Sequence, residues 1–221
     1  SRDRTRHLQD RVDEALKELR VREVDTLLRL ARAAEQRDRV TGLHLVRMAK
    51  YSALIAREYG LGEEEQEAIE LAAPMHDIGK IGIPDRILQF NGKLSREEMQ
   101  VMQTHTTIGY DLLKDSPSKY LRTAAIIALS HHEKFDGKGY PNGLSATDIP
   151  LEARIVAVGD VYDALTSVRP YKAAWLPEEA FKYLEGERGR HFDAGMVDLF
   201  LTKKDEILAI GKQFADWPIP Q

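Results

Sequence analysis

Apolar side chains recur every three or four positions along nearly the whole chain, which is the spacing of one face of an α-helix. In residues 42–58, Leu45, Met48 and Ile55 follow this spacing, and Gly60 marks the end of the segment. The same pattern predicts helices at about residues 1–36, 63–76, 95–114, 118–132, 151–167, 177–187 and 194–210. No stretch shows the sustained alternation of a half-buried strand. We therefore predict an all-α fold, a bundle of helices.

Glycine and proline interrupt this pattern in two places. The first interruption, residues 78–94, contains Gly79, Gly82, Pro84 and Gly92. The second, residues 133–150, contains Gly137, Gly139, Pro141, Gly143 and Pro150. Clusters of these residues are typical of turns and loops, so we expect two prominent loops between the helices.

The first segment is polar and has no glycine or proline between residues 1 and 36. Its apolar positions Leu8, Val12, Ala15 and Leu19 step by four, three and four residues, as in the seam of a coiled coil. Two interpretations remain open, because two heptads are too few to decide between them. The segment is either a solvated helix that packs on the body or a dimerising, signal-carrying helix that follows an upstream domain.

Composition excludes several classes of protein. The chain has 221 residues, enough for one domain or one domain with an appendage, and its net charge of −4 argues against a basic nucleic-acid binder. Cysteine is absent, which excludes disulfides, cysteine-ligated zinc, iron–sulfur clusters and thiol nucleophiles. No apolar run approaches the roughly 18 residues of a membrane span, and no signal peptide opens the chain. We expect a cytoplasmic protein.

Histidine carries the strongest chemical signal. The chain has seven histidines, and three of them form unusual pairs: His76 precedes Asp77, and His131 precedes His132. Each alone has an ordinary explanation, since a histidine at a helix C-terminus suits the helix dipole. Asp160 is harder to explain, because it follows the apolar run 155–158 and a buried carboxylate needs a partner or a metal.

Together these residues predict a metal site. With His44 and His105 they supply five imidazoles and two carboxylates in a chain without cysteine. This donor set suits a borderline metal such as Fe or Mn better than Mg or Ca. Asp160, Asp163 and Ser167 are three and four residues apart in turn, so we expect them to share one face of a helix.

Two strings resemble a known family. Residues 76–85, His-Asp-Ile-Gly-Lys-Ile-Gly-Ile-Pro-Asp, and residues 131–141, His-His-Glu-Lys-Phe-Asp-Gly-Lys-Gly-Tyr-Pro, closely resemble the HD-GYP family. That family is a subgroup of the HD-domain phosphohydrolases and hydrolyses the bacterial second messenger cyclic di-GMP. The resemblance implies an HD-domain helical bundle at residues 24–221, preceded by a linker or signalling helix at residues 1–23.

The resemblance also implies roles for individual residues. The metal ligands fall on His44, His76, Asp77, His105, His131, His132 and Asp160. Asp77 matches the bridging carboxylate, and Lys80 matches the lysine beside the scissile phosphate. The expected substrate contacts are the loop Gly139, Tyr140 and Pro141, together with Asp163, Arg169 and Lys172. The positions Glu35, Asp38, Thr41 and Arg47 fit a supporting shell.

Two positions depart from the family pattern. Some members have a glutamate that holds a third metal where this chain has Val40, and valine cannot ligate. We therefore expect two metal ions, Fe or Mn. The family's Phe-Asp-Pro is Phe192-Asp193-Ala194 here, and Asp193 can still cap a helix.

Our leading hypothesis is a metal-dependent phosphodiesterase that converts cyclic di-GMP to pGpG and GMP. The main alternative is a catalytically inactive module that binds metal and nucleotide and acts through protein partners. A third is hydrolysis of another nucleotide, against which the Gly-Tyr-Pro loop argues. Expected partners are an upstream receiver or sensor domain, a diguanylate cyclase, and a second copy joined through the N-terminal helix.

Overall fold

The computed structural model describes residues 2–36, 42–168 and 173–215, and helices dominate it. The α-helices are α1 (Arg2–Glu35), α2 (Gly42–Tyr59), α3 (Glu63–Ala72), α4 (Asp85–Leu88), α5 (Arg96–Gln103), α6 (His105–Leu113), α7 (Lys119–Ser130), α8 (Leu151–Thr166), α9 (Pro177–Gly186), α10 (Ala194–Leu201) and α11 (Lys204–Gln213). The 3₁₀ turns are η2 (Ala73–Met75), η3 (Ile78–Gly82) and η4 (Ala146–Asp148). Within the described residues, β-pairing is limited to two isolated bridges. The all-α prediction is confirmed.

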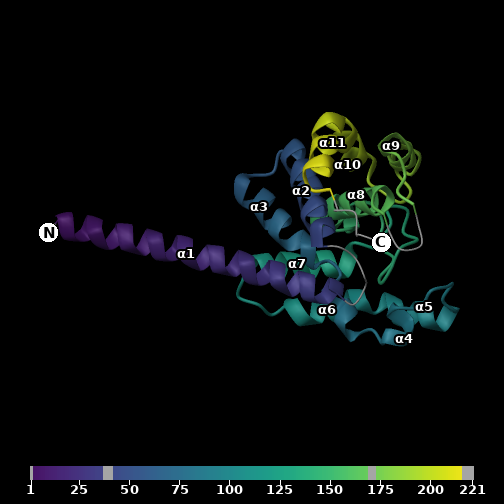
Figure 1. Cartoon of the computed structure of the whole chain (residues 1–221), viewed down its shortest axis with the longest axis horizontal. Coiled ribbons are helices and arrows are strands. Elements are labelled where there is room, and N and C mark those ends of the chain that lie inside the picture. The colour runs from purple at the N-terminus through teal and green to yellow at the C-terminus, as the bar shows by residue number, and fades with distance from the viewer. Residues whose placement is uncertain (1, 37–41, 169–172, 216–221) are drawn as a thin grey trace, which may run out of the picture.

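Helix α1 has two different halves. Its N-terminal half projects away from the rest of the molecule, while its C-terminal half lies against the body (Figure 1). Leu27, Ala31 and Ala34 are buried there, whereas Leu8 and Leu19 stay 54% and 63% exposed. The predicted boundary after residue 23 therefore falls inside one continuous helix.

Helix α2 forms the centre of the bundle and packs against α3 and α8. Its Tyr51 is fully buried and meets the rings of Tyr162 and Phe200 edge-on, with centroids 5.2 and 5.9 Å away. Phe181 of α9 stacks on Tyr162 at 5.1 Å. These aromatic contacts join α2, α8, α9 and α10 into one core.

The structure corrects three predicted boundaries. The helix expected at 95–114 is broken at Thr104, and the one expected at 194–210 is broken between α10 and α11. Threonine hydroxyls around the first break, on Thr104, Thr106 and Thr107, each bond to the carbonyl three residues earlier. Such bonds compete with the regular helix ladder. Residues 78–94, expected as a loop, contain η3 and α4.

Asp193 caps α10, as predicted, because its carboxylate accepts a hydrogen bond from the backbone N–H of Gly195 at 2.8 Å. In the parts of the chain that the structure describes, no helix combines the length and the apolar character that crossing a membrane requires.

Candidate metal centre

The seven predicted metal ligands come together at one place in the fold. Asp77, His105, His131 and His132 form one group, and His44, His76 and Asp160 form another, with the ligand atoms of each group within 4.8 Å of one another. Below we call them the Asp77 cluster and the His44 cluster. The ligands come from α2, the two residues directly after η2, the start of α6, the two residues directly after α7, and α8.

Asp77 links the two clusters. Its Oδ1 lies 3.2 Å from Nε2 of His105 and 3.5 Å from Nε2 of His131. Its Oδ2 lies 3.3 Å from Nε2 of His76, which also approaches Asp160 Oδ1 at 3.6 Å. One carboxylate therefore faces donors of both groups, which is the position expected of a bridging ligand.

Gly79 allows this convergence. A Cβ atom at Gly79 would lie 1.8 Å from the carbonyl oxygen of His105, far inside contact distance. Turn η3, which follows Asp77 directly, can therefore press against the start of α6 only because residue 79 has no side chain. The glycine of the His-Asp-Ile-Gly-Lys string is thus a packing requirement that brings Asp77 to His105.

The helices themselves orient three of the imidazoles. The Nδ1 atoms of His76 and His105 lie 3.0 and 2.7 Å from the carbonyls of Ala73 and Met102. Nδ1 of His131 lies 3.0 Å from the Ile127 carbonyl. A carbonyl only accepts, so each Nδ1 carries the proton, and in the neutral ring Nε2 keeps a lone pair directed into the site.

The donors that face the site lack partners within the protein. Asp77 Oδ1, His105 Nε2 and His131 Nε2 are buried polar atoms with no hydrogen-bond partner. Two imidazole lone pairs and a carboxylate oxygen point at one another, which is unfavourable unless a cation lies between them. The residues present therefore fit a metal, and the nitrogen and oxygen donor set matches Fe, Mn or another borderline ion.

The electrostatics of the site also favour a cation. Burial opposes a charge on His76, but the carboxylates of Asp77 and Asp160 outweigh it and raise its pKa to about 10. Burial and the neighbouring His131 hold the pKa of His132 well below its ordinary value, so that ring is a neutral donor. The first effect shows that the carboxylates attract positive charge, and the second keeps a lone pair free to ligate.

Lys80 lies at the edge of this site. Its Nζ is 2.8 Å from Asp77 Oδ2, and its side chain is 16% exposed. Although burial favours the protonated form of Asp77, Lys80 and His76 hold its pKa well below the usual range. Asp77 is therefore ionised, as a bridging ligand must be.

A hydrogen-bonded network that the sequence pattern does not predict lies on the Nδ1 side of His44. The His44 Nδ1 lies 2.5 Å from Asp163 Oδ2, and Arg47 donates to both carboxylate oxygens of Asp163. Asp163 has no exposed surface. The expectation that it contacts substrate is therefore corrected, because a fully buried carboxylate with both oxygens engaged leaves no face for a ligand.

The Gly-Tyr-Pro loop packs against a predicted metal ligand. The ring of Tyr140 stacks on His132 with centroids 4.8 Å apart and planes 23° apart. A Cβ atom at Gly139 would lie 2.3 Å from the backbone nitrogen of Lys134, so the turn requires glycine. Glu133, to which the sequence patterns assigned no role, is buried and accepts hydrogen bonds from the backbone of Asn142 and Leu144. The sequence feature that could have identified Glu133 is its position directly after the histidine doublet.

Several predicted residues lie outside the described part of the chain, namely Asp38, Val40, Thr41, Arg169 and Lys172. Of the predicted supporting shell, Arg47 and Glu35 are both buried. The Oε2 atom of Glu35 has no hydrogen-bond partner, and burial and Asp77 raise the pKa of its carboxyl. His7 and His191, the histidines without an assigned role, belong to neither cluster.

Comparison with known proteins gives consistent matches. A model of the HD domain family matches residues 12–196. The cyclic di-GMP phosphodiesterase response regulator RpfG of Xanthomonas campestris pv. campestris is 50% identical over 208 residues, which are 94% of this chain and 55% of that protein. The 3'3'-cGAMP-specific phosphodiesterase 2 of Vibrio cholerae is 43% identical over 199 residues, which are 90% of this chain and 38% of that protein.

A solved structure agrees in fold. The crystal structure of a cyclic GMP-AMP-specific phosphodiesterase of V. cholerae superposes with a TM-score of 0.63 at 19% identity. The match covers 89% of this chain and 54% of that one. Measured against the two curated relatives, this chain spans 55% and 38% of their length.

Proposed function

The chain belongs to the HD-domain family, as its HD-GYP motifs predicted, and we propose that it is a metal-dependent phosphodiesterase that hydrolyses cyclic di-GMP. The products are linear pGpG and, after a second step, GMP. The observation that carries the proposal is the set of buried, unpartnered donors around Asp77. The relative that is named a cyclic di-GMP phosphodiesterase shares half of the aligned residues with this chain, which supports this substrate.

We propose two metal ions, Fe or Mn, one held by each cluster and both by Asp77. The division of the ligands into two groups that share a central carboxylate supports this number. When bound, such a pair compensates charge at phosphorus and makes water acidic enough to attack at neutral pH.

The chain's own residues complete the chemistry. Lys80 extends its ammonium group over Asp77, where it stabilises negative charge that develops on the phosphate oxygens. Tyr140 holds the ring of His132 in place by stacking. Arg169 offers a planar fork for a phosphate or a guanine edge, and Lys172 adds a point charge.

A turnover assay tests this function directly. Full-length protein loaded anaerobically with Mn²⁺ or Fe²⁺ should convert cyclic di-GMP to pGpG, measured by chromatography. The relative named as 3'3'-cGAMP-specific supports including that dinucleotide in the same panel. Faster hydrolysis of 3'3'-cGAMP would replace cyclic di-GMP as the proposed substrate but would leave the proposed phosphodiesterase reaction unchanged. Binding of both dinucleotides in calorimetry without turnover in any metal would support the inactive signalling module instead.

The N-terminal helix supports a further part of the proposal, self-association. Leu8, Val12 and Leu19 lie along the projecting half of α1 and are at least half exposed, as the seam of a coiled coil is before pairing (Figure 1). We propose that two copies pair through this seam. We further propose that the helix follows an upstream receiver or sensor domain and that the dimer binds a diguanylate cyclase. Deleting residues 2–22 should halve the mass in sedimentation velocity. An unchanged mass would support a solvated helix.

A further inference from the structure

Asp163 is a heavily hydrogen-bonded side chain beside the predicted metal centre. It accepts from Arg47 Nε at 2.5 Å and from Ser167 Oγ at 3.0 Å, and it lies 2.5 Å from His44 Nδ1. A buried carboxylate is costly unless it is paired and hydrogen-bonded, and here every contact is made by a specific partner. Because this carboxylate is fully buried, it can act only on the side chains that surround it.

The contact with His44 fixes the state of that ring. Because an ionised carboxylate only accepts, His44 carries its proton on Nδ1 and keeps the lone pair of Nε2 for a metal. His76, His105 and His131 have carbonyl partners instead, three or four residues away on their own helical turns. A carboxylate partner holds a ligating imidazole more strongly than a carbonyl does and raises its basicity.

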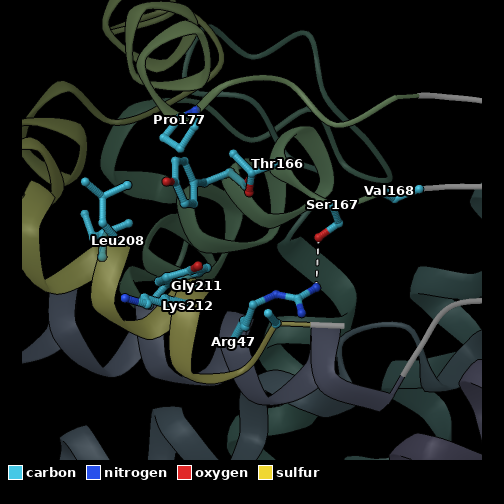
Figure 2. Close-up of a pocket in the computed structure, with 12 residues that line it drawn as sticks. Arg47, Thr166, Ser167, Val168, Pro177, Leu208, Gly211 and Lys212 are labelled. Carbon is cyan, nitrogen blue, oxygen red and sulfur yellow. Dashed lines mark hydrogen bonds between the residues drawn. The ribbon is translucent and has the colours of Figure 1, made fainter. Parts of the chain in front are cut away.

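Arg47 connects this carboxylate to the C-terminal helix. Its guanidinium donates to the backbone carbonyl of Phe214, directly after α11, at 2.8 Å and to Ser167 Oγ at 2.8 Å. Figure 2 shows the bond between Arg47 and Ser167 beside a cavity of about 320 Å³, which Leu208, Gly211 and Lys212 of α11 also line. The network thus joins α2, the end of α8 and the end of α11.

We propose that Asp163 is a positioning residue for the metal of the His44 cluster, and that Arg47 holds Asp163 in place. The inference deepens the proposed function, since it rests on an ion being held by His44, His76 and Asp160. Asp163 acts only through His44, so it affects one ion and leaves the ion of the Asp77 cluster in place.

Replacing Asp163 by asparagine tests the proposal. The side-chain amide keeps the shape but can donate to Nδ1 of His44, which moves the ring proton to Nε2 and blocks ligation. Titration of metal-free full-length protein with Mn²⁺ should give two binding steps in the wild type. In Asp163→Asn one step should weaken about 10- to 100-fold while the other is unchanged. Gly211→Ala is the control, because the added Cβ meets only Tyr51 Oη at 3.4 Å in the same cavity.

A spectroscopic measurement on the wild type keeps the test decisive if Asp163→Asn fails to fold. In Zn²⁺-loaded protein labelled with ¹⁵N-histidine, His44 should carry its proton on Nδ1 and bind metal through Nε2. The opposite tautomer would overturn the proposal. So would equal weakening of both Mn²⁺ steps, or no weakening, in a folded Asp163→Asn.

Neither the Mn²⁺ titration nor the ¹⁵N-histidine measurement uses a dinucleotide, so neither depends on which substrate the protein hydrolyses. Failure of the proposed function would appear instead as wild-type protein that binds Mn²⁺ in two steps but hydrolyses no substrate. The two outcomes are therefore separable.

Discussion

The two metal clusters are supported in different ways. In the Asp77 cluster, His105 and His131 are oriented by carbonyls of residues three or four positions earlier in the chain. In the His44 cluster, His76 also has a local carbonyl partner, but His44 is oriented by Asp163, which is 119 residues away in sequence and is itself held by Arg47. The carbonyl partners of His105 and His131 require only the local helical turn. The Asp163 partner of His44 requires α2, α8 and α11 to be packed together.

This difference predicts which cluster is more sensitive to tertiary structure. A local hydrogen bond persists as long as its own helix does, because both partners move together. A bond between distant elements is lost when either element shifts. We therefore expect changes far from the ligands to weaken metal binding by the His44 cluster before binding by the Asp77 cluster, although both serve the proposed reaction.

The largest expected effect removes the group that both clusters share. Asp77→Ala should lower turnover of cyclic di-GMP by at least about 1,000-fold, because it deletes the bridging carboxylate and the partner of Lys80. Metal analysis should show that both ions are lost. Asp111→Ala is a matched control, since Asp111 also pairs with a lysine three residues later, at 2.7 Å, but on the surface. Retention of both ions in Asp77→Ala would contradict the bridging role.

Removing one ligand from each cluster should separate them. His105→Ala should lose the ion of the Asp77 cluster and keep the other, and His44→Ala should do the reverse. The measurement is metal content per chain after anaerobic loading, with ¹⁵N-histidine spectra of Zn²⁺-loaded protein to identify the ligands that remain. Loss of both ions in either variant would mean that the clusters form a single, cooperative site.

A smaller effect is expected when a residue serves catalysis without ligating. Lys80→Ala should lower kcat about 100-fold, the scale for removing one group that stabilises transition-state charge, and leave metal content unchanged. Lys114→Ala is the control, because Lys114 pairs with Asp111 as Lys80 pairs with Asp77. If Lys80→Ala lost an ion, the lysine would be structural.

The smallest expected effect on the site comes from loosening α11. Ile207 is fully buried, so Ile207→Ala should lower the free energy of unfolding by about 2 to 5 kcal/mol. It should also weaken the Mn²⁺ step of the His44 cluster by less than about tenfold, less than direct loss of an outer-shell partner. Leu208→Ala, on the same helix but 40% exposed, should change neither quantity appreciably. Weaker Mn²⁺ binding at the Asp77 cluster alone would contradict the expectation that the His44 cluster is the more sensitive of the two.

Much of the fold and the site could be predicted from local sequence. The helical periodicity gave the all-α class, and the break near Gly60 gave the end of α2 to within one residue. The break at Thr104 could not be predicted from periodicity, because the apolar spacing continues through it. That break places His105 at the start of a helix, where Gly79 lets η3 approach.

The sequence by itself determined which residues we propose to carry the chemistry. The adjacent pairs His76-Asp77 and His131-His132, the absence of cysteine and the Gly-Tyr-Pro loop follow from residue identity alone. Only the tertiary structure decided that Asp163 lies behind His44 and not toward substrate. Helical spacing places Asp160 and Asp163 in α8, which ends one residue before Ser167. The spacing contains no information on which neighbour each side chain meets. That depends on how α2 and α11 pack against α8, through contacts between residues that are far apart in the chain.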